Sequence, residues 1–478
     1  MDMTAATFGA THLDPTKTFV QGGDFYWDFA IYDTLLHINP DGSYSPGLAL
    51  GAKTISPTAI TVTLRAGEQF SDGTPFNGAT VKEAILRNES FKKAAFLPVF
   101  FDLSSIEVNS PTEITLELSK PEAGAFYPLL AENEFFLSSP AASSKSSINL
   151  DAQPVGAGPY LVKSYTPNQR IELEKNSHYW NAAKVRLAAL NIINVPAGPQ
   201  QLTALESGQV DIESGLVASQ VNALRQNGMT WTTNLRNNDA IRVGVCKSTP
   251  PFDSPLVRQA LNYATDKLAL NQTVEAGMGQ PQWGLFPIGA QYHVNALDGF
   301  YSYDPQKAKA LLAQAGYPSG FSTSLTISPG DASLSQVAQI LQAEWSQVGV
   351  KLKLVTTTNV VQTFYQEHET PLAIGAIGEP NINTVAAPYT PGYVGDICNY
   401  SNPQLNSWVQ QLSAGSMSPV QANETWSNIQ QLVVKTALAI FGVFVPVVTA
   451  WNSHVSQVEI LQTFYGFTPN PALLVRNV

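Results

Sequence analysis

The stretch from Ala59 to Val81, AITVTLRAGEQFSDGTPFNGATV, is the part of the sequence that limits the fold most. Apolar and polar residues alternate from Ile60 to Leu64, which predicts a half-buried strand. Ser71–Pro75 predicts a turn, because Gly tolerates positive φ and Pro restricts its own φ. Thr80 and Glu83 have the spacing of a capping box, so we expect a helix to begin there. Strand, turn and helix in this order indicate α/β architecture.

The size and charge of the chain narrow the functional classes. With 478 residues it is too long for a single core, and about two or three domains are expected. Charged residues make up only 13%, so the surface must rely on uncharged polar residues. The net charge is 26 − 37 = −11 and no basic run occurs, which disfavours binding to nucleic acid or to an anionic membrane surface.

Apolar runs are short throughout the sequence. The longest, Ala437–Val448, is interrupted by Gly442 and Pro446 and falls well below the ~20 residues of a membrane-spanning helix. We therefore predict a buried strand there. Near Met1 the sequence does not have the pattern of a signal peptide and leads almost directly into a predicted strand.

Two cysteines, Cys246 and Cys398, are present. They form either one disulfide across a long loop or two buried thiols. Because nothing in the sequence indicates that they are close together, we favour the thiols. Their spacing excludes a CxxC redox or zinc motif.

Motifs of catalysis are missing from the sequence. The six histidines are scattered without metal-binding spacing, and neither a nucleophile-elbow motif nor a phosphate-binding loop motif occurs. Gly156-Ala157-Gly158 lacks the third glycine and the following helix of a dinucleotide loop, so we interpret it as a turn. We therefore expect no enzymatic activity, no cofactor and no metal site built from the protein alone.

Several segments resemble one known family. Leu64–Gly67 followed by Phe70–Phe76 is similar to the "LR-x-G-x-x-F-x-DG-x-PF" signature of extracytoplasmic solute-binding proteins of ABC importers, family 5. This branch (cluster C) includes oligopeptide, dipeptide and nickel binders. Further similar segments follow in the family's order: Tyr32–Leu36, Pro154–Tyr160, Asn176–Trp180, Leu205–Ile212 and Pro250–Ala264.

The resemblance implies a bilobal α/β fold of the periplasmic-binding-protein type (type II, cluster C) with an extra insertion domain. Domain I is expected to comprise residues 1–45, 155–245 and 450–478. The insertion, domain II, is expected at 46–154, and domain III, the second lobe, at 246–449.

The resemblance also implies a function. The chain is expected to be the substrate-binding component of an ABC import system, which captures a small solute between its lobes and delivers it to a membrane permease. A peptide or peptide-like ligand is favoured, and a sugar, an opine-like compound or a metal chelate remains an alternative. So does a receptor or chaperone without a transport role. The resemblance further implies a monomer outside the cytoplasm, in the periplasm or on the outer face of the cell membrane, made with an export signal and a lipidated cysteine.

Candidate ligand-binding residues fall into two groups. Aromatic side chains near predicted loops can form the walls of a cleft. Peptide-binding members hold the ligand's ammonium group with an Asp, but the corresponding segment here, 375–381, has neither Asp nor Trp, so Glu379 or Asp396 is the expected substitute. The full set is Phe25, Tyr26, Trp27, Phe136, Trp283, Glu379, Asn381, Asp396, Asn399, Tyr400 and Trp451.

Overall fold

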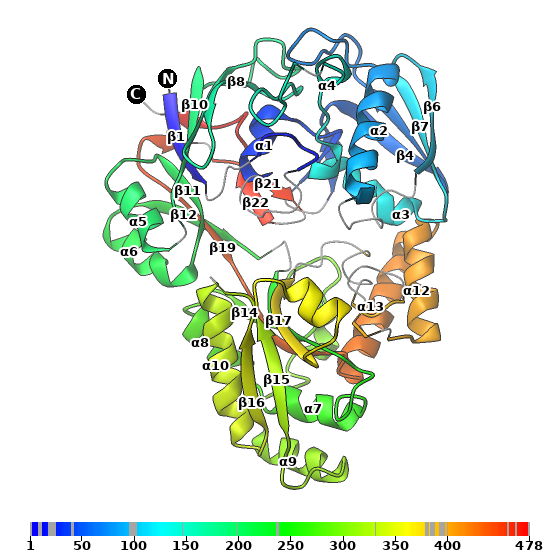
Figure 1. Ribbon diagram of the computed structural model, residues 1–478, viewed down its shortest axis with the longest axis vertical. Coiled ribbons are helices and arrows are strands. Elements are labelled where there is room, and N and C mark those ends of the chain that lie inside the picture. Colours follow the sequence, from blue (N-terminus) through cyan, green and yellow to red (C-terminus); the bar gives the residue numbers. More distant parts are fainter. Residues whose placement is uncertain are drawn as a thin grey trace. The chain divides into compact units, whose positions relative to one another are not determined.

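The computed structural model (Figure 1) describes residues 2–7, 12–17, 25–39, 43–94, 103–145, 147–196, 198–235, 239–329, 331–377, 382, 388–391, 397–398, 400–456, 458–463 and 466–476.

The chain divides into two compact units. Unit 1 comprises Met1–Asn234, Ser413–Ser416 and Val447–Val478, and unit 2 comprises Leu235–Leu412 and Met417–Pro446. Both units are built from mixed sheets and helices, so the expected α/β class is confirmed. The finer expectation, that the first lobe contains domains I and II and that domain III spans 246–449, stays a prediction.

Unit 1 contains a mixed seven-stranded sheet (Figure 1). Its strands, in spatial order, are β12 (Thr230–Asn234), β19 (Val447–Trp451), β11 (Ile212–Leu216), β1 (Asp2–Thr7), β10 (Ala189–Asn194), β9 (Arg170–Lys175) and β8 (Tyr160–Thr166). β1 lies between β10 and β11 and runs parallel to both. One face of this sheet contributes to a core that includes Leu173, Leu190, Ile192 and Ile212.

A second, antiparallel sheet in unit 1 contains the Ala59–Val81 stretch. Its strands, in spatial order, are β4 (Ala49–Ser56), β5 (Ala59–Leu64), β7 (Glu113–Leu118) and β6 (Leu103–Ser110). The predicted strand is confirmed as β5, in which Ile60 and Val62 are fully buried. The predicted capping box is wrong, because the helix begins earlier, at Gly78, and the Oδ1 atom of Asn77 accepts from the backbone amides of the first turn.

The rest of unit 1 consists of two small sheets and of helices, of which α2 is the longest. Two small sheets contain β22 (Gly466–Pro469), β21 (Ile460–Thr463), β2 (Leu36–Ile38) and β3 (Tyr44–Pro46), and β20 (Val455–Ser456) with β23 (Val475–Arg476). The helices among its described residues are α1 (Phe25–Ile31), α2 (Gly78–Ala94), α3 (Ala123–Phe126), η3 (Tyr127–Ala131), η4 (Asn133–Phe135), α4 (Pro140–Ser143), α5 (Pro199–Glu206), η5 (Ala218–Gln220) and α6 (Val221–Gln226).

Unit 2 is organised around a six-stranded sheet. The strands, in spatial order, are β14 (Gln280–Pro281), β18 (Ala439–Phe444), β13 (Ala240–Val245), β17 (Leu372–Ile377), β15 (Ser322–Ile327) and β16 (Lys351–Thr356). Among the described residues from 255 to 435, the helices are α7 (Pro255–Tyr263), α8 (Lys267–Val274), η6 (Asn295–Leu297), α9 (Pro305–Gln314), α10 (Ala332–Ser346), η7 (Val361–Gln366), α12 (Pro403–Ala414) and α13 (Pro419–Lys435).

Apolar periodicity explains the core of unit 2. On α10, Val337, Leu341 and Trp345 recur at helical spacing and are at most 2% exposed. They pack in one cluster with Ile241 and Val243 of β13, while β15 and β16, which flank α10 in sequence, pair in parallel. The βαβ unit therefore buries an apolar helix face against the sheet.

The run Ala437–Val448 does not form the single buried strand that we predicted. It forms β18 in unit 2 and β19 in unit 1, with Pro446 as the last residue of unit 2. Proline has no N–H to continue a strand ladder, so the run is divided at this point.

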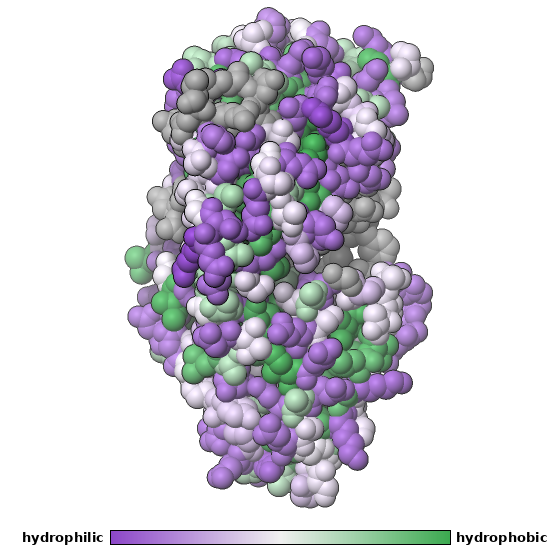
Figure 2. All heavy atoms as spheres, turned by 90° about the vertical axis from the view of Figure 1, so that its left-hand side faces the viewer, coloured by the Kyte–Doolittle hydropathy of each residue, from purple (hydrophilic) through white to green (hydrophobic). Residues whose placement is uncertain are grey.

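The surface of the protein is polar without being highly charged. The face shown in Figure 2 mixes hydrophilic and hydrophobic residues, as a chain with 13% charged residues requires. None of the helices in the described ranges combines the length and the apolar character needed to cross a membrane.

Candidate functional site

Asp33 connects two of the sequence segments that carry the family resemblance. Its carboxylate is 4% exposed and accepts four hydrogen bonds. Oδ1 accepts from the Thr34 amide (2.9 Å) and lies 2.5 Å from Nε2 of His37. Oδ2 accepts from the Tyr179 hydroxyl (2.9 Å) and from Nε1 of Trp180 (2.8 Å). The segments 32–36 and 176–180 therefore meet at one buried anion.

Electrostatics stabilise this network in its charged form. Burial opposes ionisation of Asp33, but the charge of His37 and the hydrogen bonds from His37, Trp180 and Tyr179 together lower its pKa. Burial alone would lower the pKa of His37, but the charge of the Asp33 carboxylate and its hydrogen bond to His37 outweigh burial, so the pKa of His37 is raised. The guanidinium of Arg65, from the signature stretch, stacks on Trp180 at 3.8 Å and donates from Nε to the Gly47 carbonyl (2.7 Å). These motif residues thus hold unit 1 together.

The other motif segments also have structural roles. A Cβ atom on Gly158 would lie 2.5 Å from the carbonyl carbon of Ile31, and the Gly158 amide donates to the Ile31 oxygen (2.9 Å). Only glycine permits this approach. In unit 2, the buried guanidinium of Arg258 donates to four backbone carbonyls, including those of Ala437 (2.8 Å) and Phe252 (2.7 Å). The interpretation of 156–158 as a turn agrees with this packing.

Three of the predicted aromatic residues begin α1, and two more lie elsewhere in unit 1. Phe25–Trp27 form the first turn of that helix. Phe136 is fully buried, with its ring 4.7 Å from that of Phe29 and 5.8 Å from that of Tyr32, so it packs in the core of unit 1. Trp451 ends β19 and packs half-buried against the same core. Ligand contacts by these residues stay predictions.

Two predicted aromatic residues of unit 2 lie beside buried lysines. The Lys267 ammonium is 5.7 Å from the ring of Trp283, and burial lowers the pKa of Lys267 to about 7. The Lys247 ammonium lies 5.2 Å from the rings of both Tyr389 and Tyr400 and donates to the carbonyls of Val245 and Leu438. Tyr400 is therefore part of a cation–π cluster.

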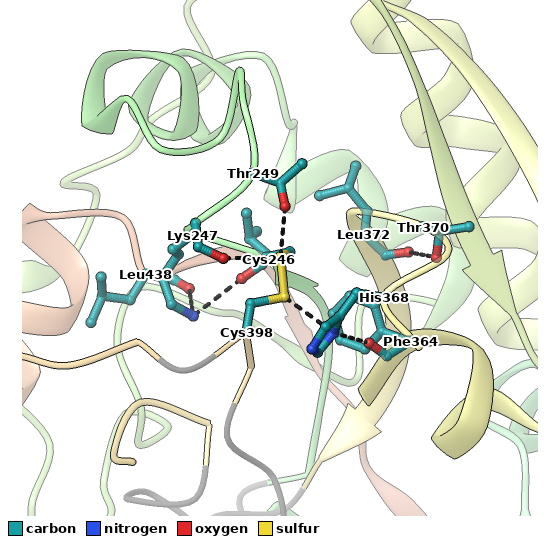
Figure 3. The surroundings of a disulfide bond; sticks show 11 residues. Cys246, Lys247, Thr249, Phe364, His368, Thr370, Leu372, Cys398 and Leu438 are labelled. Carbon is teal, nitrogen blue, oxygen red and sulfur yellow. Dashed lines mark hydrogen bonds between the residues drawn. A yellow bond between two sulfur atoms is a disulfide. The ribbon is translucent and has the colours of Figure 1, made fainter. Parts of the chain in front are cut away.

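A disulfide lies next to this cluster. Cys246 directly follows β13 and bonds to Cys398, with an S–S distance of 2.05 Å and a Cα–Cα distance of 5.2 Å. Figure 3 shows Thr249 and His368 on either side of it, with the Thr249 hydroxyl 3.0 Å from the Cys246 sulfur and Nδ1 of His368 3.4 Å from the Cys398 sulfur. Our preference for two free thiols was wrong, because folding brings together residues that are 152 positions apart.

The four polar candidates Glu379, Asn381, Asp396 and Asn399 lie outside the described residues. Within the described ranges, no group of three or more His, Cys, Asp or Glu side chains has an arrangement that could hold a metal ion.

Sequence reasoning missed a row of buried polar residues in unit 1. Glu132, Asn133 and Glu134 are each at most 3% exposed, although they stand between apolar residues that pack in the core. Neither atom of the Asn133 carboxamide has a hydrogen-bond partner among the described residues. The available signal was three polar letters, ENE, between the apolar runs YPLLA and FFL.

Comparisons with known proteins agree with this fold. Residues 43–396 match the profile of bacterial extracellular solute-binding proteins, family 5 (middle). Glutathione-binding protein GsiB of Escherichia coli K12 is 30% identical over 307 residues, which cover 63% of this chain and 59% of the relative. The aligned region thus spans less than two thirds of the curated relatives' length.

Solved structures resemble the whole chain. The binding protein AgaA from Agrobacterium tumefaciens R10, in complex with agropinic acid, has a TM-score of 0.83 at 22% identity, with 100% and 99% of the two chains covered. The binding protein DppA from Helicobacter pylori, in complex with the peptide STSA, has a TM-score of 0.81 at 20% identity, with 100% and 98% covered. With the profile match over most of its length, the chain belongs to family 5 of the bacterial extracellular solute-binding proteins.

Proposed function

We propose that the chain is the substrate-binding component of an ABC import system that captures a small solute between its two units and delivers it to a membrane permease. The observation that carries this proposal is the family match over residues 43–396. The division into two units, joined where β12 leads toward β13 and β18 toward β19, supports it. Hinged units can close on a ligand, and the ligand then favours the closed state by its higher affinity for it.

The ligand that we propose is a peptide or a peptide-like solute. A glutathione-binding relative and a neighbour in complex with a peptide support this class. An opine-like ligand is the second candidate, favoured by the neighbour that holds agropinic acid. Binding in this account involves no covalent chemistry, so no turnover of the ligand is expected.

The proposal also covers the oligomeric state, the location and the ligand-contacting residues of the protein. We propose a monomer outside the cytoplasm, attached to the membrane through a lipid, which presents its ligand-bound form to the permease. Family membership supports the extracytoplasmic location. The aromatic candidates of both units, Trp27 and Trp451 in unit 1 and Trp283 and Tyr400 in unit 2, are proposed to contribute to the ligand surface.

A thermal-shift panel tests the ligand class. Di- and tripeptides, opines, sugars and metal chelates are each added to the purified protein. A ligand present at 100 times its Kd adds ~2.7 kcal/mol to the free energy of unfolding, so a true ligand moves the melting temperature clearly. A shift with peptides alone supports the proposal. A shift only with sugars or chelates contradicts the peptide class, and no shift with any small solute favours a receptor or chaperone role.

A further inference from the structure

A pocket of about 520 Å³ lies at one end of the six-stranded sheet of unit 2. Its lining comes from the first residues of β15 and β16 (Figure 1), from Pro371, which precedes β17, and from Pro250 and Pro251 in the segment after β13. The volume falls in the range of pockets that hold small molecules, about 300–1,000 Å³. All lining residues belong to unit 2, so this unit alone builds the pocket.

The pocket lies at the end of β13 that is remote from the passage of the chain between the units. β13 begins at Ala240, shortly after the chain enters unit 2 at Leu235. It ends at Val245, which pairs with Leu372, the residue after Pro371 of the pocket. Six residues of a strand span about 20 Å, and this length separates the pocket from the passage.

The floor of the pocket is held by a close approach of the two strands. A Cβ atom on Gly320 would lie 2.0 Å from the carbonyl oxygen of Gly349, so only glycine permits this approach. Directly after these residues, the Lys351 amide donates to the Phe321 carbonyl (2.8 Å). The first residues of β15 and β16 are therefore fixed relative to each other before any ligand binds.

The register of the strands places two lysines and two serines on the same face. In the parallel pair, Ser322 lies opposite Lys351 and Ser324 lies opposite Lys353. Side chains two residues apart in a strand point to the same face, with their Cα atoms about 6.6 Å apart. Leu352, between the lysines, is 5% exposed and packs in the apolar core of unit 2, so the lysines lie on the outward side.

The pocket is positive although the chain has a net charge of −11. None of the nine described residues that line it is acidic, and neither β15 nor β16 contains Asp or Glu. Among the described residues, the ammonium groups of Lys351 and Lys353 have no ion-pair or hydrogen-bond partner. Lysine ammonium groups bind carboxylates and phosphates as point charges, and serine hydroxyls can donate further hydrogen bonds to them.

We propose that this pocket is a second binding site of the protein, which takes a small organic anion that carries a phosphate group or several carboxylates. Lys351 and Lys353 neutralise its charge, and the hydroxyls of Ser322 and Ser324 donate to its oxygens. The proline rings of the wall contact its carbon skeleton. The inference goes beyond the proposed function, because this site is additional to the solute site between the units.

Calorimetry at low ionic strength tests the site with glycerol 3-phosphate and with citrate, and glycerol serves as the uncharged comparison. The variants are Lys351→Gln, Lys353→Gln and the double substitution. Lys53→Gln is the matched control, because Lys53 is an exposed lysine of β4, which is also the outer strand of a sheet, and it does not line the pocket.

We expect the wild type to bind at least one of the two anions and not glycerol, with an affinity that falls as NaCl is added. Each single substitution should raise the Kd ~2–5-fold, as for exposed ion pairs, and the double substitution at least about fivefold. Lys53→Gln should leave the Kd unchanged.

Three outcomes overturn the inference. The first is that neither anion binds to the wild type. The second is equal binding by the wild type and the double variant, which would show a nonspecific interaction with the anions. The third is an unchanged Kd with increased association of the double variant in light scattering, which would show that the lysines only protect the edge strand β16 from pairing.

A separate readout distinguishes this site from the proposed function. Uptake of di- and tripeptides from a mixture, followed by native mass spectrometry, should be the same for the wild type and the double variant. A double variant that loses peptide together with the anion would show one shared site and overturn the inference. A wild type that binds the anion but no peptide would contradict the peptide class of the proposed function and leave the inference standing.

Discussion

Replacement of Asp33 by Asn should destabilise unit 1 strongly. Both carboxylate oxygens accept two hydrogen bonds, one pair from Thr34 and His37 and the other from Tyr179 and Trp180. An asparagine must turn its NH₂ group toward one of these two pairs. The donors of that pair then face another donor instead of an acceptor. Removal of one partner from a buried ion pair costs ~3–5 kcal/mol. We expect a loss in that range for Asp33→Asn in urea denaturation followed by Trp fluorescence.

The pH dependence tests the mechanism of this loss. The lowered pKa of Asp33 stabilises the folded state above the unfolded carboxyl pKa near 4, and this stability disappears as the pH falls through the folded value. The raised pKa of His37 stabilises the folded state below the unfolded value of 6.5 and is lost as the pH rises through the folded value. The gap between wild type and variant should therefore be widest between about pH 4 and 6.5.

A matched variant, His37→Gln, should lose less stability, because Tyr179, Trp180 and Thr34 still donate to Asp33. A loss below about 1 kcal/mol for Asp33→Asn, or a gap that does not change between pH 6 and pH 9, would refute the reasoning.

Three further perturbations have defined outcomes. Burial raises the pKa of Glu213 from 4.5 to about 8. Between these two values the free energy of unfolding of the wild type should therefore fall by ~1.4 kcal/mol for each unit by which the pH rises, and Glu213→Gln should flatten this slope in urea denaturation. Reduction of the disulfide or substitution of Cys246 and Cys398 by Ser should destabilise unit 2 by up to ~5 kcal/mol, given a separation of 152 residues; in calorimetry, an unmoved unit 2 transition would argue against this. Gly158→Ala should lower the melting temperature strongly, whereas Gly51→Ala, where nothing lies within 4 Å of an added Cβ, should change it little.

The motifs predicted the fold well because they are the residues that hold the fold together. Asp33, Gly158 and Arg258 make buried contacts that hold this fold together, so these motif residues are informative about structure. Residues that determine ligand specificity do not have to make such structural contacts. The buried polar segment Glu132–Glu134 belongs to no motif, and only the structure shows that it lies in the interior of unit 1.

The sequence predictions that were wrong failed because they depended on the path of the chain in the folded protein. Asn77 and Thr80 are both good capping residues, and only the path of the preceding chain decides which one begins the helix. The division of the run Ala437–Val448 between two sheets depends on where the chain changes unit, which hydrophobicity does not encode. The disulfide depends on contact between positions that are distant in sequence, and local patterns carry no information about such contacts.

The most direct test of the central claim is native mass spectrometry of the purified protein, followed by denaturation and identification of any released molecule. The account predicts a monomer that carries one peptide or peptide-like solute, or that takes up one such solute per chain when a mixture of di- and tripeptides is added. A protein that retains a sugar or a metal chelate, or that takes up no peptide from the mixture, would contradict it.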